Sequence, residues 1–495
     1  MKMKSLHKLI TKIEPPHWVL AIIAFIVLFR IPSFFEPYFY GDEMIYMTLG
    51  LGIRRGLTLY KQIFDNKPPL IYFTAALAGN LFWFKAILAF WMIATTICFW
   101  HLVKNLFKDN SLAQYVSVII FAIFTTIPLF EGNIVNAELF LIGPIILGLT
   151  VLLSKPTYKN IFLSGMIFAV GALFKIPASF DVPVIVVFWF ITLENLNFKN
   201  FLELIKKTFI LALGFSIPIL LTFVWYFYKG ALSDYIKAAF LQNINYVSSW
   251  NGGPQQSFVV KHGPLLIRAG IVVLGFIILR IFNKKLSRPF LIGSIWLLTS
   301  LFAVTLSERP YPHYMIQAIP SISILVGILV ASPKFEQVLT IIPLTLAIFV
   351  PVYYKFYYYS SSAYYIRFAN FATGQISKDN YFNSFDKYTK GNYDVAQFLM
   401  NSTDKNDKVF IWGDTAPIIY SLARRLPEIK YVAAYHINDY SSKVDLLNEL
   451  ESAPPPFIVI PPNSSPFPEL ITFVRAKYVN IYGNNGFTVW HLLAN

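Results

Sequence analysis

The residues best suited to chemistry lie in a polar stretch, 35–68, between two apolar segments. Asp42 and Glu43 follow a glycine there and open a helix-like run, 43–55. A carboxylate in this place can act as a general base that takes a proton from an acceptor hydroxyl. The same carboxylate can be a helix N-cap, which accepts hydrogen bonds from free backbone amides. A helix N-terminus also lowers the pKa of a carboxylate and weakens it as a base, so both roles of Asp42 stay open.

The same stretch ends in the sequence DNKPP, 65–69. Two consecutive prolines hold the chain extended where it re-enters the apolar region, and they fix Lys67 at that boundary. Lys67 is either an anchor whose ammonium reaches back to water or a point charge for a lipid phosphate.

Three further stretches place polar residues at the ends of apolar segments, on the same side as 35–68. They contribute Glu131 and Glu138, Lys175 and Asp181, and Glu308, Arg309, His313 and Tyr314. Glu138 suits the N-terminus of a helix, although an acidic residue at the start of a span also needs a partner or water. We expect Lys175 and Asp181 to form a local ion pair. Arg309 and His313, beside two prolines, make a candidate anion site.

Composition places most of the chain in lipid. The 495 residues are 56% hydrophobic and 14% charged, against ~25% charged in soluble domains. The single cysteine excludes a disulfide within the chain and a cysteine-based zinc site. The stretch 69–83 is either a short interfacial helix or the beginning of the second span. Hydropathy predicts about eleven spans, at 18–34, 84–103, 112–130, 136–154, 160–177, 181–194, 207–228, 264–282, 289–306, 313–331 and 337–354.

Basic residues indicate how these spans are oriented. Every loop on the side of the N-terminus carries lysine or arginine. In the loops near 131–136 and 307–312, by contrast, the only basic residue is Arg309. This asymmetry predicts a multi-pass plasma-membrane protein with a cytoplasmic N-terminus and an extracytoplasmic C-terminal part. The net charge of +15 then reflects membrane orientation, and no nucleic-acid partner is expected. We expect Lys85 and Lys175, near span ends, to reach water by snorkelling.

The pattern changes after a tyrosine-rich belt at 353–368, which is typical of the headgroup region. Short strands are predicted at 408–413, 429–435, 456–462 and 486–493, and helices at 393–401, 415–425, 441–452 and 467–477. Alternating strands and helices favour an α/β domain with a largely parallel sheet. The predicted division is a transmembrane catalytic domain, 1–354, with a long first outer loop at 35–68, and an extracytoplasmic α/β domain, 355–495.

These motifs resemble the GT-C superfamily of glycosyltransferases that use polyprenyl-phosphate sugars. The matching features are GDEMIY at 41–46, the glycine and tyrosine of 56–60, DNKPPLIYF at 65–73, NAELF at 136–140 and RPYPHYMIQAIP at 309–320. The nearest branch is the PMT-like group, which includes relatives of protein O-mannosyltransferases and the lipid A aminoarabinose transferases. The resemblance implies a polytopic GT-C fold with the α/β tail outside the cytoplasm. It also implies inverting transfer of a sugar, hexosyl or pentosyl, to a glycan, lipid or protein hydroxyl at the outer face of the bilayer.

The resemblance assigns roles to particular residues. Asp42 matches the catalytic aspartate, Lys67 matches a lysine beside the lipid phosphate, and Glu138 matches a second acidic position. Arg309 and His313 could supply further positive charge to the departing phosphate, and Glu43 could orient the loop or the acceptor. Further candidates are Tyr46, Asp65 and Tyr314.

The sequence departs from the aminoarabinose transferases at two positions. Asn66 stands where they carry a metal-binding glutamate, and Ile45 stands where they carry an arginine. The metal requirement is therefore left unknown: no cofactor is assigned, and a divalent cation stays open.

Two alternative functions for this membrane protein can be compared with the glycosyltransferase interpretation. A flippase or transporter of lipid-linked sugars would share a basic, aromatic outer face, but it predicts inverted repeats and broken helices at mid-membrane. The sequence shows neither, and its polar residues stay on one side. A non-catalytic envelope assembly protein would not need the acidic pair and the lysine of 35–68.

Overall fold

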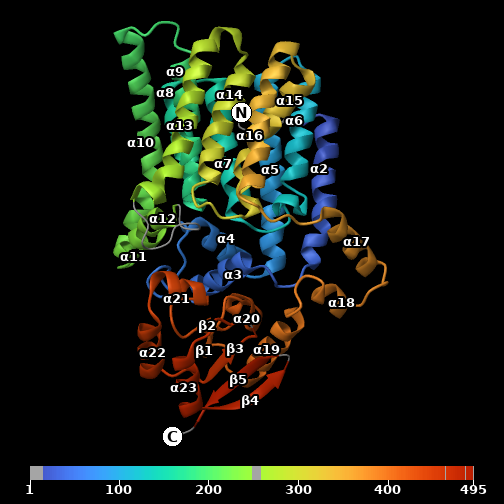
Figure 1. Cartoon of the computed structure of the whole chain (residues 1–495), viewed down its shortest axis with the longest axis vertical. Coiled ribbons are helices and arrows are strands. Elements are labelled where there is room, and N and C mark those ends of the chain that lie inside the picture. The colour runs from blue at the N-terminus through green and yellow to red at the C-terminus, as the bar shows by residue number, and fades with distance from the viewer. Residues whose placement is uncertain (1–14, 248–257, 463, 485, 494–495) are drawn as a thin grey trace, which may run out of the picture.

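The computed structural model describes residues 15–247, 258–462, 464–484 and 486–493. A bundle of long helices forms one end of the molecule, and a small sheet with its helices forms the other (Figure 1). Helices α3 (Gly41–Arg54) and α4 (Leu70–Ala78) lie between the two parts. The stretch 35–68 therefore separates the bundle from the C-terminal unit.

Each predicted span coincides with one helix, or with two consecutive helices, of the bundle. Its helices are α2 (His17–Arg30) with η1 (Ile31–Phe35), α5 (Leu81–Phe107), α6 (Ser111–Phe124), α7 (Ala137–Ser154), α8 (Tyr158–Phe174), η3 (Ile176–Asp181) with α9 (Pro183–Ile191), α10 (Phe198–Tyr228), α13 (Phe258–Phe282), α14 (Arg288–Val304), η6 (Pro312–Ala318) with α15 (Ile319–Ala331), and α16 (Lys334–Tyr353). Among the described residues, seven helices are long and apolar enough to cross a membrane and four apolar helices are shorter. The total of eleven spans stays a prediction.

The outer surface of the bundle is apolar. In α10 only 11% of the most hydrophobic window is buried, although its mean hydropathy is 2.1. Such a surface is stable only against lipid, because a water-soluble protein does not expose apolar patches of this extent. The chain is an integral membrane protein.

Small residues let the bundle helices approach closely. A Cβ atom added to Gly165 in α8 would overlap the carbonyl oxygen of Leu211, and one added to Gly214 in α10 would overlap that of Phe162. Such close approach of backbones is the usual means of helix association where water cannot drive packing.

The first outer loop contains helix α3, and the separate short helix α4 follows it. The N-cap of α3 is Tyr40 without a side-chain cap bond, so Asp42 lies inside the first turn and the cap interpretation is wrong. Helix α4 ends at Gly79, whose left-handed φ of 71° suits glycine, and α5 begins where Asn80 accepts a hydrogen bond from the amide of Trp83. The stretch 69–83 is thus largely a helix of its own.

Shorter elements complete this part of the chain. They are η2 (Pro128–Phe130), α11 (Leu232–Ile236), the π-helical turn η4 (Lys237–Leu241), α12 (Gln242–Tyr246) and η5 (Asn283–Lys285).

The C-terminal part contains a five-stranded mixed sheet in the order β2-β1-β3-β5-β4. Strand β1 is parallel to β2 and β3, whereas β5 is antiparallel to β3 and β4, so the prediction of a largely parallel sheet is wrong. The elements are α17 (Ser361–Ala372), α18 (Lys378–Asn383), α19 (Thr389–Ser402), β1 (Lys408–Ile411), α20 (Ala416–Ala423), β2 (Leu426–Pro427), α21 (Ala434–Tyr440), α22 (Lys443–Ser452), β3 (Phe457–Ile460), α23 (Pro468–Lys477), β4 (Tyr478–Asn484) and β5 (Phe487–Leu492).

The C-terminal unit contacts the first outer loop directly. The hydroxyls of Thr48 and Ser421 lie 2.9 Å apart, and Ser421 also donates to the carbonyl of Met44. The amide of Phe64 donates to the carbonyl of Lys430 at 2.9 Å. The unit therefore positions α3 and the segment that leads to Lys67.

Candidate active site

A polar cavity of about 610 Å³ lies where the bundle, the first outer loop and the C-terminal unit meet. The structure brings together residues that the sequence placed in four separate stretches. Those lining the cavity include Asp42, Asp65, Lys67, Glu131, Lys175, Arg309, His313 and Tyr314.

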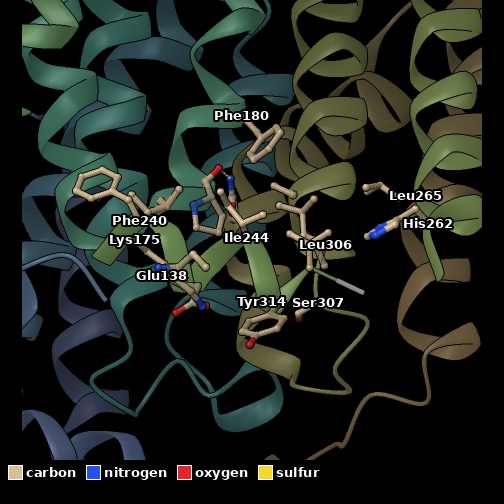
Figure 2. A pocket seen from close by; sticks show the side chains of 17 residues that line it. Glu138, Lys175, Phe180, Phe240, Ile244, His262, Leu265, Leu306, Ser307 and Tyr314 are labelled. Carbon is tan, nitrogen blue, oxygen red and sulfur yellow. Dashed lines mark hydrogen bonds and ion pairs between the residues drawn. The ribbon is translucent and has the colours of Figure 1, made fainter. Parts of the chain in front are cut away.

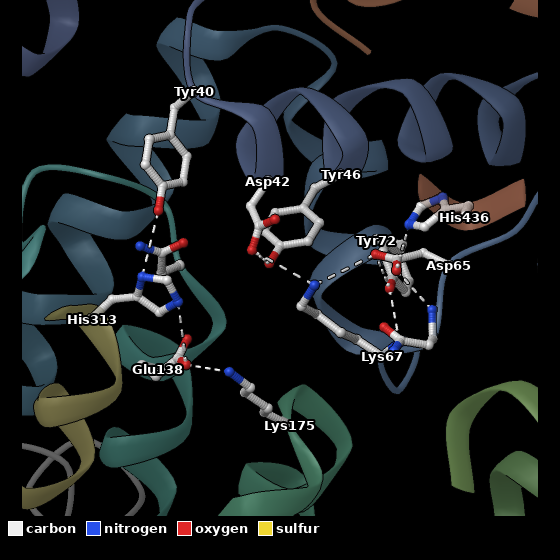
Figure 3. Close-up of polar contacts among 12 residues, drawn as sticks. Tyr40, Asp42, Tyr46, Asp65, Lys67, Tyr72, Glu138, Lys175, His313 and His436 are labelled. Atoms are coloured by element: carbon white, nitrogen blue, oxygen red, sulfur yellow. Dashed lines mark hydrogen bonds and ion pairs between the residues drawn. The ribbon is translucent and has the colours of Figure 1, made fainter. Parts of the chain in front are cut away.

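Asp42 and Lys67 face each other in this cavity (Figure 3). The Asp42 carboxylate lies 3.7 Å from the Lys67 ammonium and accepts a hydrogen bond from the Tyr46 hydroxyl at 3.2 Å. The ammonium lies 5.2 Å from the centre of the Tyr46 ring and 3.7 Å from the Asp65 carboxylate. Asp42 keeps 30% of its side chain exposed whereas Asp65 keeps 2%, so Asp42 is the carboxylate that a ligand can reach.

The backbone of Lys67 is held on both sides. The Tyr60 hydroxyl donates to the Lys67 carbonyl at 2.8 Å, and the Lys67 amide donates to the Tyr72 hydroxyl at 3.1 Å. Tyr72 in turn donates to Asp65 at 2.8 Å. These bonds restrict the position of the Lys67 backbone. A lysine that only anchored the chain at the membrane surface would not need this restriction.

Electrostatics keep both aspartates ionised. Burial opposes ionisation of Asp42, but the positive charges of Lys67 and His313 outweigh it and hold the pKa of Asp42 below its usual value. Burial also opposes ionisation of Asp65, yet Lys67 and a hydrogen bond from His436 lower the pKa of Asp65. Asp42 is therefore unprotonated and able to accept a proton at neutral pH.

The C-terminal unit contributes polar partners that the sequence did not predict. His436 in α21 lies 3.4 Å from Asp65, and Asn66 donates to the Tyr440 hydroxyl at 2.7 Å. These pairs are about 370 residues apart in the chain, so no local pattern could reveal them.

A row of polar side chains forms another wall of the cavity (Figure 3). The Tyr40 hydroxyl donates to Glu131 at 2.7 Å, and the two ring nitrogens of His313 face Glu131 at 2.5 Å and Glu138 at 3.8 Å. Glu138 pairs with Lys175 at the far end of the row. His313 thus lines the cavity with carboxylates against both nitrogens, while its role toward a phosphate stays a prediction.

The expected ion pair between Lys175 and Asp181 is wrong. Lys175 pairs with Glu138 and lies 4.2 Å from the centre of the Tyr314 ring, and it does not pair with Asp181. Asp181 is buried and accepts hydrogen bonds from Ser300 and Gln317, both at 2.8 Å. The partners of each residue come from other helices rather than from its own turn.

Glu43 and Lys85 lie in a separate, buried cluster. The Lys85 ammonium pairs with Glu36 and with Glu43, the latter at 3.1 Å, and Glu43 also accepts from the amide of Val135 at 2.6 Å. Lys85 is only 2% exposed, so the expectation that it snorkels is wrong. Glu43 is fully buried and outside the cavity, and it fastens α3 to the bundle.

The residues around Asn66 do not fit a metal ion. Asp65 already contacts Lys67, Tyr72 and His436, and the Asn66 side-chain nitrogen faces Tyr440. Within the described ranges, no group of three or more histidine, cysteine or acidic residues is arranged to hold a metal. No step below involves one.

An apolar pocket of about 420 Å³ adjoins the polar cavity inside the bundle (Figure 2). The two share Lys175, Ile176, Asn243 and Tyr314. Apolar residues of the pocket include Phe180, Phe240, Ile244, Leu265, Val304 and Leu306. Lys175 therefore lies where the apolar pocket meets the polar cavity of Asp42 and Lys67. Hydropathy alone could not predict this position.

Comparison with solved structures identifies this architecture. The aminoarabinose transferase ArnT from Cupriavidus metallidurans, solved bound to undecaprenyl phosphate, aligns over 97% of this chain and 99% of its own, with a TM-score of 0.56 and 15% identity. The chain has the GT-C fold. The apo structure of the same ArnT aligns over 96% of this chain with the same TM-score and 14% identity. The GT-C fold predicted from the motifs is thus confirmed.

Weaker or absent similarities mark the limit of the comparison. The archaeal oligosaccharyltransferase AglB from Archaeoglobus fulgidus aligns over 90% of this chain and 69% of its own, with a TM-score of 0.45 and 12% identity. No protein-family model matches the sequence, and no curated protein matches it significantly.

Proposed function

We propose that the protein is an inverting glycosyltransferase that moves a sugar from a polyprenyl phosphate to an acceptor hydroxyl at the outer face of the membrane. The observation that carries the proposal is the junction at Lys175, where an apolar pocket within the bundle adjoins the polar cavity of Asp42 and Lys67. A lipid-linked sugar has the same division between an apolar chain and a polar head.

The pocket and the cavity assign the two ends of the donor. The lipid chain occupies the apolar pocket, and its phosphate lies at the junction, within reach of Lys175 and Lys67. The ArnT neighbour was solved with undecaprenyl phosphate, which is a ligand of this chemistry. Arg309 also lines the cavity and adds positive charge to it.

The reaction follows from these positions. The acceptor oxygen forms a bond to the anomeric carbon, and the bond from that carbon to the phosphate oxygen breaks. The electron pair leaves with the phosphate, which the two lysines stabilise without protonating it. Asp42 takes the acceptor proton, and general-base catalysis of this kind contributes ~10²–10⁴ in rate.

Asp65 positions the reaction rather than taking part in it. Its carboxylate is buried and contacts Lys67, Tyr72 and His436, so it fixes the ammonium beside the base. Tyr46 similarly orients Asp42 through its hydroxyl.

The test uses the full-length purified protein with radiolabelled polyprenyl-phosphate sugars. We expect one donor to be consumed, with release of polyprenyl phosphate. Leu306→Trp, which fills part of the apolar pocket, should impair a long-chain donor much more than a farnesyl-length donor.

Two results would overturn the proposal. One is that no donor of a panel of hexosyl and pentosyl phosphates is consumed. The other is that, in proteoliposomes, the labelled donor moves between leaflets unchanged, which is the result that a flippase predicts.

A further inference from the structure

A second cavity of about 260 Å³ adjoins the polar cavity at another wall. Its lining comes from the segment before α3, from the turn after η2, and from α17 and the residues that follow α18. The two cavities share Tyr40, Glu131 and Tyr359. The C-terminal part of the chain therefore closes one side of this second cavity.

The second cavity and the apolar pocket meet the polar cavity at opposite ends of one row of residues. The row runs from Tyr40 through His313 and Glu138 to Lys175 (Figure 3). Tyr40 belongs to the second cavity, and Lys175 belongs to the apolar pocket. A ligand in the second cavity thus approaches Asp42 from the end remote from the lipid chain.

The walls of the second cavity combine aromatic rings with hydrogen-bonding groups. The rings are those of Phe39, Tyr40, Tyr359, Tyr364 and Phe385, and the polar groups include Glu131, Asn133, Ser360 and Arg367. Rings of this kind pack against the apolar faces of a sugar, while amide, carboxylate and guanidinium groups bond its hydroxyls.

Arg367 is the polar residue best placed to receive a ligand. Its guanidinium lies 3.9 Å from the centre of the Phe385 ring and donates to the Ser384 carbonyl at 2.9 Å. Its Nε is buried and has no hydrogen-bond partner among the described residues, which also offer it no ion pair. Arg367 lines the second cavity, where guanidinium N–H groups can donate to a ligand oxygen.

Glu131 sits in a strained conformation at the boundary of the two cavities. Its φ of 58° is left-handed, a conformation that residues other than glycine rarely adopt, and such strain concentrates at functional sites. Its side chain is fixed by Tyr40 and His313. The carboxylate therefore presents a constant surface where the second cavity opens toward Asp42.

We propose that the second cavity binds the acceptor and that the acceptor is a glycan, with a sugar ring against Tyr40 and Phe385. This inference rests on the proposed function. Inverting displacement needs the nucleophile on the face of the donor sugar opposite to the leaving phosphate. A ring entering from the Tyr40 end meets that requirement, because the phosphate lies at the Lys175 end. The acceptor hydroxyl bonds to the anomeric carbon and gives its proton to Asp42.

The size and polarity of the cavity favour a sugar over the other acceptors. Pockets for drug-sized ligands are ~300–1,000 Å³, so this smaller cavity suits one sugar unit. A lipid acceptor would need a continuous apolar groove, whereas hydrogen-bonding side chains interrupt these walls.

The experiment measures donor turnover by the full-length protein with methyl glycosides of glucose, galactose, mannose and N-acetylglucosamine as probes. We expect at least one glycoside to accelerate turnover above the rate with water alone. Phe385→Ala and Arg367→Gln should each raise the KM for that glycoside about tenfold, the loss expected for one aromatic or charged contact. The KM for the donor should change much less.

Matched controls are Phe382→Ala and Lys378→Gln, which replace residues of α18 that do not line the second cavity. Both should keep the wild-type KM for the glycoside, and thermal melting checks that every variant folds. Turnover that a serine-containing peptide or a diacylglycerol accelerates, and no glycoside does, overturns the inference. So does an equal KM in Phe385→Ala, Arg367→Gln and the controls. Failure of the wild type to consume any donor would instead refute the proposed function.

Discussion

The carboxylates of Asp42 and Glu43 are adjacent in the sequence but belong to two separate clusters of charge. Asp42 faces Lys67 in the polar cavity, whereas Glu43 is fully buried against Lys85. Consecutive residues of a helix point in different directions. Asp42 therefore presents its carboxylate to the polar cavity, whereas Glu43 holds the same turn of α3 against the bundle. Substitutions at the two positions should therefore have different consequences.

Asp42→Asn should reduce sugar transfer by ~10²–10⁴ while the protein stays folded, because an amide cannot accept the acceptor proton. The measurement is turnover of the lipid-linked donor, with the melting temperature as the control for folding. Glu43→Gln should affect turnover less and melting more. Near-normal turnover by a folded Asp42→Asn protein would mean that the base lies elsewhere, with Glu138 next to be tested.

Lys85→Met should lower the stability of the protein strongly. It leaves Glu36 and Glu43 buried without their cation, and breaking a buried pair costs ~3–5 kcal/mol. The check is thermal melting in detergent, with Lys61→Met as the control on an exposed lysine. The double variant Lys85→Met with Glu43→Gln should recover part of the loss. Equal melting temperatures for Lys85→Met and the wild type would contradict the role of this cluster.

Lys67→Ala should raise the apparent KM for the donor by about tenfold or more, because a hydrogen bond to a charged group is worth ~1.5–3 kcal/mol. Lys61→Ala is the matched control, since Lys61 carries the same charge in the same loop, and its ammonium donates a hydrogen bond to the Gly230 carbonyl. General attraction to the membrane surface should be similar for both lysines. Equal donor KM values for the two variants would leave Lys67 as an anchor.

The pH dependence of turnover should report the contact between Lys67 and Asp42. Asp42 must be unprotonated to act, so activity falls as the pH drops through the pKa of Asp42, which lies below the usual ~3.9. In Lys67→Gln the lowering charge is gone and burial remains, so the acid limb of kcat should move to higher pH. An unchanged acid limb at saturating donor would show that another group controls it.

The C-terminus should lie outside the cytoplasm and the N-terminus inside it. The reason is the basic residues of the loops on the N-terminal side, whereas Arg309 is the only basic residue in the short loops near 131–136 and 307–312. A phosphatase fused to the C-terminus should be active, and a reporter that needs the cytoplasm should be silent. The reverse result would place the cavity on the wrong side for an extracytoplasmic donor.

Local patterns predict the helices of this chain well, because an apolar run of about twenty residues is a strong signal. The strands are harder. The segment 429–435 is rich in β-forming residues but lies outside any strand, and helix α21 begins at Ala434 within it. The strand β4 (Tyr478–Asn484) was not predicted, although the Asn-Gly pair at 485–486 is a hairpin signal. The antiparallel pairing of β5 with β3 and with β4 makes the sheet mixed.

The site was predictable only where its residues lie close together in sequence. Asp42, Asp65 and Lys67 share one loop, and the prolines after Lys67 indicate a fixed position. The partners of Lys85 and Lys175, and the contact of His436 with Asp65, depend on helix packing and on docking of the C-terminal unit. Hydropathy and spacing contain no information on such contacts.

The bonds that Phe64 and Asn66 form with the C-terminal unit limit how this protein can be recombined. A chimaera that received the C-terminal unit of another protein with this fold would lose the partners of the segment before Lys67. The ammonium beside the base would then lose its support, even with every membrane helix intact. The C-terminal unit and the segment 64–67 depend on each other for their positions. A chimaera that exchanges the two together should therefore preserve the site.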